Sequence, residues 1–283
     1  MPPEASPIRT IFHDVDGCLN PEDGSQFVSG EDHRRLTAEQ KGMLKRVSAA
    51  IDASSIEHVI LNTGRRLVDT LFIAEELATS KLRYLLSETG AVAYDLIQDA
   101  PIDLVGVAEE SKRPELAAPF EDMSAVQELI HWYNSGGEQL LADEIGSPIH
   151  QIPKDTLLTL HVPESATGSS FVEDLKRLLR MQTSIEQGRL RFYYNDFHVD
   201  IASAVDKGTG AQILLEMLGV PASAAAMIGD GLNDVAAFRA CGHGFCPSNS
   251  AEPLKAVCRA MGGVVLEESF GAASVEVFQR LTA

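Results

Sequence analysis

The chain has 283 residues, of which 45% are hydrophobic and 23% are charged, and this balance is typical of a globular protein with one large domain or two modest ones. Its 41 acidic residues outnumber its 23 basic residues, which gives a formal net charge of −18. Such a field repels nucleic acid and anionic membranes, so we expect neither as a partner. It also repels phosphorylated molecules, unless a metal ion or local basic groups oppose it.

Targeting features give no sign of export. Residues 1–7 lack the basic start and apolar stretch of a secretory signal, and no run reaches the roughly 18 apolar residues that a membrane helix needs. Four cysteines in a chain of this length do not indicate a disulfide framework. We therefore predict a cytoplasmic protein with free thiols.

The first part of the chain alternates strands and helices. Residues 8–13 are a β-prone run, and a long polar loop, 20–35, follows the acidic residues at its end. Thr37 and Gln40 form a capping box, which predicts the start of a helix. The apolar face of that helix comprises Met43, Leu44, Val47, Ala50 and Ile51.

A second strand is predicted at 58–62, and it ends at Thr63-Gly64-Arg65. The helix after it has a predicted apolar stripe formed by Leu67, Val68, Leu71 and Phe72. A third strand follows at 84–86. This alternation favours a parallel sheet.

The C-terminal part repeats the alternation. A helix at 208–218 is stopped by Gly219, and a strand at 224–228 ends at Gly229-Asp230-Gly231. Further short strands are predicted at 244–246 and 263–266, each followed by a helix. Strands that alternate with helices predict an α/β protein with a doubly wound parallel sheet.

The middle of the chain has a different pattern. β-like runs at 91–97, 157–162 and 190–194 are mixed with helical runs at 123–133 and 171–179. Between them lies a connector that contains Pro101, Pro114 and Pro119. We interpret 91–194 as an inserted α+β module between the two parts of a core domain, 1–90 and 195–283.

Polar side chains follow four of the predicted elements of the core. They are Asp14 and Asp16, Thr63 and Arg65, Lys207, and the group Asp230, Asn233 and Asp234. Because ligands of open α/β sheets bind beyond the carboxyl ends of the strands, we expect these side chains to converge at one edge. Alone, each group is also compatible with a turn, a helix cap or a solvated charge.

Together, these residues fit phosphoryl chemistry. Asp14 could bind a metal and attack phosphorus, while Asp16 hands a proton to the leaving group. Thr63 and Gly64 could offer a hydroxyl and an amide to the phosphoryl oxygens, and Lys207 could neutralise their charge. Because so many carboxylates need a cation and oxygen ligands suit Mg²⁺, we predict a magnesium site.

Four motifs resemble those of the haloacid dehalogenase superfamily in order and spacing. They are Asp14-Val15-Asp16-Gly17, Thr63-Gly64-Arg65, Asp206-Lys207-Gly208 and Gly229-Asp230-Gly231-Leu232-Asn233-Asp234. The stretches Ser87-Glu88-Thr89-Gly90-Ala91 and Asp200-Ile201 resemble the Cof-type branch. The resemblance covers roughly 7–90 and 195–283.

This resemblance implies a Rossmann-like core and an inserted cap domain that sets substrate specificity. It implies that Asp14 is the nucleophile, that Asp16 is the general acid and later the base, and that Thr63 and Lys207 hold the phosphoryl group. The residues that it associates with phosphate or substrate are Thr63, Gly64, Arg65 and Asn233. Those that it associates with Mg²⁺ are Asp14, Asp16 through its carbonyl, Asp230 and Asp234.

The sequence departs from the family pattern at three positions near these motifs. Cys18 and Asn20 stand where the family usually has Thr and Leu, and Thr89 replaces the usual Asn. None of these changes removes a group that the chemistry needs. His13 adjoins the nucleophile, but alternation along the strand predicts that its side chain packs on the opposite side.

The prediction is a phosphatase that acts on a small sugar phosphate or related metabolite through an aspartyl-phosphate. In the inserted module, His150, His161 or His198 could contact that substrate. A phosphomutase of the same superfamily is a close alternative. A non-enzymatic phospho-accepting signalling module and a sugar transferase with an Asp-x-Asp metal motif belong to other classes, and the sequence does not indicate an oligomeric state.

Overall fold

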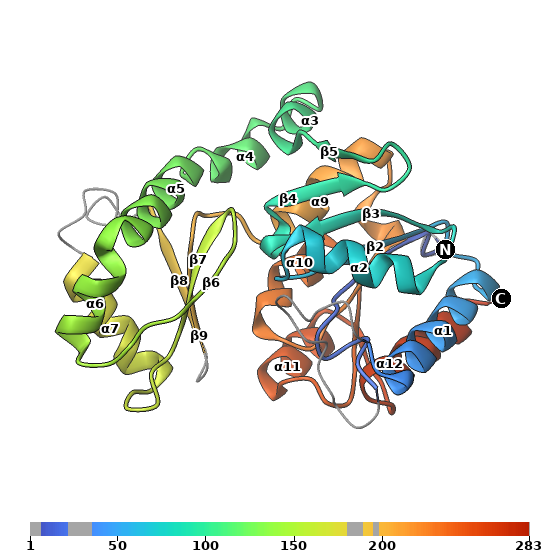
Figure 1. The fold of residues 1–283 in the computed structure, drawn as a ribbon. Coiled ribbons are helices and arrows are strands. Elements are labelled where there is room, and N and C mark those ends of the chain that lie inside the picture. Colours follow the sequence, from blue (N-terminus) through green and yellow to red (C-terminus); the bar gives the residue numbers. More distant parts are fainter. Residues whose placement is uncertain (1–6, 22–35, 180–188, 195–197, 283) are drawn as a thin grey trace. The chain divides into compact units, whose positions relative to one another are not determined.

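The computed structural model describes residues 7–21, 36–179, 189–194 and 198–282 (Figure 1). The chain divides into two compact units, Met1–Leu116 with Asp206–Ala283, called unit 1, and Ala117–Val205, called unit 2. Within the described ranges, no helix is both long and apolar enough to cross a membrane. Most of the predicted polar loop at 20–35 lies outside the described residues.

Unit 1 is built on an eight-stranded sheet with the strand order β12-β11-β10-β1-β2-β3-β4-β5. The strands from β12 to β3 pair in parallel, whereas β4 and β5 are added in antiparallel pairing. The strands are β1 Thr10–His13, β2 His58–Asn62, β3 Leu82–Ser87, β4 Val92–Asp95, β5 Ala100–Ile102, β10 Ala225–Ile228, β11 His243–Cys246 and β12 Val264–Val265.

Helices pack on this sheet in two groups (Figure 1). The first group consists of α1 Ala38–Ala53, α2 Leu67–Leu77 and α12 Phe270–Arg280, and the second of α3 Leu104–Glu110, α9 Lys207–Leu218, α10 Val235–Ala240 and α11 Glu252–Ala260. A short helix, α4 Pro114–Ala117, follows α3. The predicted α/β class with a doubly wound, mainly parallel sheet is confirmed.

Local sequence signals account for several element ends. The capping box is present at α1, where Thr37 accepts a hydrogen bond from the Gln40 amide and Gln40 accepts one from the Thr37 amide. Gly219 ends α9 in the left-handed conformation that favours glycine. Both predicted signals are therefore confirmed.

The predicted apolar stripe of α2 is wrong in part. Val68 is 45% exposed, and the buried residues of the helix are Asp69, Thr70, Ile73, Ala74 and Leu77. Polar residues enter the buried face because each has a partner: Asp69 accepts from the Arg66 guanidinium, and the Thr70 hydroxyl donates to the Arg66 carbonyl. Hydrophobicity alone could not identify this face.

The unit boundaries differ from those predicted at 90/91 and 194/195. Unit 1 continues to Leu116, because β4 and β5 extend its sheet and α3 packs on α9. It resumes at Asp206, because the strand at 198–202 belongs to the sheet of unit 2. The segment with Pro101, Pro114 and Pro119, predicted as a connector, contains regular secondary structure, since it folds into β5, α3 and α4.

Unit 2 contains an antiparallel four-stranded sheet in the order β6-β7-β9-β8. Its elements are α5 Met123–Trp132, α6 Glu138–Ile145, β6 Gln151–Ile152, β7 Leu157–His161, α7 Gly168–Leu179, β8 Arg191–Tyr194 and β9 His198–Ala202. Phe171 of α7, Leu158 of β7 and Tyr133 pack in one apolar core. The elements α6, β6 and β9 were not predicted as separate elements.

Candidate active site

A buried lysine joins two of the predicted acidic residues. The Lys207 side chain is fully buried, and its Nζ lies 2.8 Å from Asp14 Oδ1 and 2.6 Å from Asp234 Oδ1. Asp14 follows β1, Lys207 begins α9, and Asp234 lies in the turn after β10. Because β1 and β10 are neighbours in parallel pairing, their carboxyl ends bring Asp14 and Asp234 together, and the start of α9 adds Lys207.

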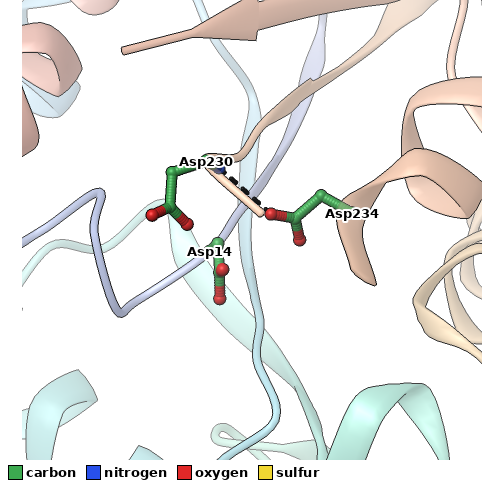
Figure 2. Close-up of side chains that lie close together, drawn as sticks. All are labelled: Asp14, Asp230 and Asp234. Carbon is green, nitrogen blue, oxygen red and sulfur yellow. Dashed lines mark hydrogen bonds between the residues drawn. The ribbon is translucent and has the colours of Figure 1, made fainter. Parts of the chain in front are cut away.

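Asp230 completes a group of three carboxylates with Asp14 and Asp234, whose oxygens lie within 4.8 Å of one another (Figure 2). Asp234 Oδ2 accepts hydrogen bonds from the amides of Asp230 and Gly231, each at 3.1 Å, while Oδ1 accepts from Lys207. Both oxygens of Asp234 are thus engaged within the protein. Asp234 is therefore better suited to holding the loop and Lys207 than to direct contact with a cation.

When all three carboxylates are ionised, this group has two negative charges in excess, since three carboxylates face one ammonium. Burial raises the pKa of Asp14 well above its usual value, and the Asp234 carboxylate adds to this effect. Burial, together with Asp234, raises the pKa of Asp230 to about 7. Burial lowers the pKa of Lys207, but Asp14 and Asp234 outweigh it and raise that pKa overall.

The donor set fits a hard divalent cation. Asp14 and Asp230 offer carboxylate oxygens, the ligands that Mg²⁺ favours, and a 2+ ion would balance the excess charge. Gly17 packs against this group so tightly that an added Cβ would lie 1.9 Å from Asp230 Oδ2, and its φ of +74° also favours glycine. The backbone after Asp16 therefore runs directly beside the Asp230 carboxylate.

Asp16 has a different environment from the three grouped acids. Its carboxylate accepts two hydrogen bonds from Arg65, from Nε at 2.8 Å and from Nη2 at 2.6 Å. The carboxylate therefore lies outside the group around Asp14, so only the backbone carbonyl of Asp16 is left as a candidate ligand. The guanidinium of Arg65, expected to touch substrate, holds Asp16 instead.

The remaining predicted site residues differ in burial and in hydrogen bonding. Thr63 is buried at the end of β2, and its hydroxyl accepts a hydrogen bond from the Arg65 amide at 3.2 Å, while Gly64 follows in the same turn. Asn233 is exposed, and its side chain makes no hydrogen bond within the part of the chain that the structure describes. Its association with phosphate or substrate stays a prediction.

One residue that supports the site was missed. Asn62, buried at the last position of β2, donates from Nδ2 to the Lys207 carbonyl at 3.0 Å. This bond ties the end of β2 to the first residue of α9, whose side chain carries the buried ammonium. An asparagine that ends an otherwise apolar strand was the available signal, since a buried amide needs a partner.

His13 packs on the side of β1 that alternation predicted. Its ring stacks on Phe278 with centroids 6.2 Å apart, and its Nε2 lies 2.8 Å from Ser274 Oγ. Burial lowers the pKa of His13 to about 4, so the ring is neutral at pH 7. The expectation that His13 packs in the core is confirmed.

Comparison with known proteins agrees with this arrangement. The family model for haloacid dehalogenase-like hydrolases matches residues 11–269. The chain belongs to this family. The match includes all four motifs on which the resemblance was based, as well as the inserted unit 2.

One curated protein is similar in sequence to part of the chain, and two solved structures share its fold at low identity. Phosphoglycolate phosphatase from Methanosarcina acetivorans is 28% identical over 121 residues, 39% of this chain and about half (52%) of that relative's length. The sucrose-phosphatase from Synechocystis, solved with sucrose and phosphate, has a TM-score of 0.62 at 15% identity and covers 97% of this chain and 98% of that chain. A Thermoplasma acidophilum protein has a TM-score of 0.61 at 16% identity, with the same coverage.

Proposed function

We propose that the protein is a Mg²⁺-dependent phosphomonoester hydrolase that works through an aspartyl-phosphate intermediate. The observation that carries the proposal is the Asp14 carboxylate, which is buried beside the Lys207 ammonium and grouped with Asp230 and Asp234. Asp14, Asp230 and the Asp16 carbonyl would hold the ion, with Asp234 supporting them. When bound, the ion would neutralise charge on the phosphoryl oxygens.

The chain's own groups account for the two half-reactions. In the first, Asp14 forms a bond to phosphorus as the ester P–O bond breaks, and Asp16 donates a proton to the departing oxygen. In the second, Asp16 takes a proton from a water molecule that attacks phosphorus, which frees Asp14 and releases phosphate. Lys207 stabilises the negative charge, while Thr63 and Gly64 offer a hydroxyl and an amide to the phosphoryl oxygens.

We infer a small sugar phosphate or related metabolite as the substrate. Support comes from the face of the unit 2 sheet that lies opposite the one carrying the core residue Leu158. On it, Asp200 Oδ1 accepts from the Thr159 hydroxyl at 2.5 Å and lies 3.7 Å from Lys154 Nζ. Tyr193 is the register partner of Asp200. Alternating donors and acceptors of this kind suit the hydroxyl groups of a sugar.

The structural likeness to a sucrose-phosphatase and the sequence similarity to a phosphoglycolate phosphatase both favour a small phosphate ester. We retain the proposal that unit 2 sets substrate specificity. We also retain His161 and His198, which are register partners in β7 and β9, as candidates for substrate contact. The four free, buried cysteines are consistent with the reducing cytoplasm that we propose as the location.

Phosphate release from a panel of sugar phosphates and phosphoglycolate, with Mg²⁺ and with a chelator, tests the proposal. We expect multiple turnovers with Mg²⁺ and none with chelator, and we expect Asp14→Asn to abolish turnover while the circular dichroism spectrum is retained. Wild-type turnover by Asp14→Asn would disprove the nucleophile assignment. Transfer of phosphate to a second sugar hydroxyl would favour a phosphomutase, and a single phosphorylation without turnover would favour a signalling module.

A further inference from the structure

The loop after the nucleophile is fixed by a side chain within the loop itself. Asn20 is buried, and its Oδ1 accepts a hydrogen bond from the Gly17 amide at 2.6 Å. The backbone of Asn20 is held in turn, because its carbonyl accepts from the Gly271 amide at 2.9 Å, where α12 begins. The amide oxygen of Asn20 is therefore a fixed acceptor that faces Gly17.

The Gly17 amide belongs to the same peptide unit as the Asp16 carbonyl. That unit is planar and trans, so its N–H and C=O point in opposite directions. A bond that draws the Gly17 N–H toward Asn20 consequently turns the Asp16 carbonyl away from Asn20. The same unit lies against the carboxylate group, since a Cβ on Gly17 would lie 1.9 Å from Asp230 Oδ2.

We propose that Asn20 is a positioning residue that orients the Asp16 carbonyl toward the divalent cation held by Asp14 and Asp230. This inference rests on the proposed Mg²⁺-dependent function. It assigns a use to a residue that departs from the family pattern, since a leucine at position 20 has no hydrogen-bond acceptor. Partners that orient metal ligands in this way typically change metal affinity by 10- to 100-fold when removed.

A second asparagine provides a matched control. Asn249 Nδ2 donates to the Gly17 carbonyl at 2.9 Å, and its Oδ1 accepts from the Phe270 amide at 2.8 Å. It therefore fixes the peptide unit after Gly17, which does not contain the Asp16 carbonyl. Removing either side chain loosens the same glycine, but only the loss of Asn20 frees the carbonyl that faces the cation.

The test measures Mg²⁺ binding by isothermal titration calorimetry and melting temperature in chelator, using the full chain. We expect Asn20→Ala and Asn20→Leu to raise the Kd for Mg²⁺ by about 10- to 100-fold. Asn20→Asp keeps an acceptor oxygen, so we expect its affinity to be at least that of wild type. Asn249→Ala should lower the melting temperature in chelator about as much as Asn20→Ala, with a much smaller change in Kd.

Three results would overturn the role of Asn20: wild-type Mg²⁺ affinity in Asn20→Ala, an Asn20→Asp variant as weak as Asn20→Ala, or an equal loss of affinity in Asn249→Ala. A failure of the proposed function has a different signature. In that case the wild type binds no Mg²⁺, or Asp230→Asn binds it as tightly as the wild type. Mg²⁺ binding by the wild type that Asp230→Asn loses, with no effect of Asn20, would refute this inference alone.

Discussion

Replacing Asp230 by asparagine should stabilise the metal-free protein at neutral and alkaline pH. Its carboxyl has a pKa of about 7 in the folded protein, against an ordinary value of 3.8, because of burial and the neighbouring Asp234. The folded state therefore binds this proton more tightly than the unfolded state. The stability that protonated Asp230 provides is fully present below pH 3.8 and is lost as the pH rises through about 7.

The magnitude follows from the two pKa values. At about 1.4 kcal/mol per tenfold change, ionisation of Asp230 costs the folded protein about 4 kcal/mol at pH 7 and about 2 kcal/mol at pH 5. An asparagine has no such cost. The cost in the wild type is smaller than these values, because the other carboxylates relax around ionised Asp230. We therefore expect Asp230→Asn to raise the free energy of unfolding by about 2–4 kcal/mol at pH 8.

Denaturant unfolding in chelator at pH 8 and pH 5 measures this gain. Asp143→Asn, at an exposed position of α6 in unit 2, makes the same change of net charge and should have little effect at either pH. Mg²⁺ should stabilise the wild type and Asp143→Asn, but not Asp230→Asn, because a ligand stabilises only the state that binds it. Equal or lower stability of Asp230→Asn at pH 8 would refute this account of the charge at the site.

Three further variants test other parts of the site. Lys207→Met leaves three carboxylates without their ammonium, so unfolding in chelator should show a loss of about 3–5 kcal/mol; wild-type stability would contradict the buried ion pairs. Gly17→Ala places a Cβ against Asp230 at a positive φ. We therefore expect a loss of about 1–3 kcal/mol of stability, seen as a lower melting temperature, and weaker Mg²⁺ binding by calorimetry. An unchanged melting temperature and Mg²⁺ affinity would show that the loop can move aside. Asp16→Asn should lower kcat/KM, which reports the first half-reaction, about 10²- to 10⁴-fold for an alkyl phosphate and less for p-nitrophenyl phosphate, whose leaving group needs no proton; equal losses in kcat/KM would argue against an acid role.

The core of the fold was predictable because its signals are local. Alternation of apolar strands with capped helices located β1, β2, β3 and β10, and parallel pairing then brought Asp14 and Asp234 together. The position of β4 and β5 was not predictable in this way. Each of these strands pairs in antiparallel with the strand just before it, and a β-like run does not itself show whether it extends that sheet or starts another, so the first predicted boundary lies 26 residues before the end of this part of unit 1.

Side-chain partners were also beyond the sequence. Asp14 and Asp16 are two residues apart, but one faces Lys207 and the other faces Arg65. Spacing shows that two carboxylates follow a strand and does not show which cation each will meet. Similarly, the departure at Asn20 was visible in the sequence, but its bond to the Gly17 amide depends on how the loop closes.

The strand order of unit 1 has a consequence for the synthesis of the protein. The central strand β1 pairs on one side with β2 and on the other with β10, which is translated about 215 residues later. At a translation rate of about 5–20 residues per second, one edge of β1 stays unpaired for roughly 10–40 s until β10 has been synthesised. Because unpaired strand edges recruit other chains, a nascent chain arrested before Ala225 should aggregate or remain bound to a chaperone.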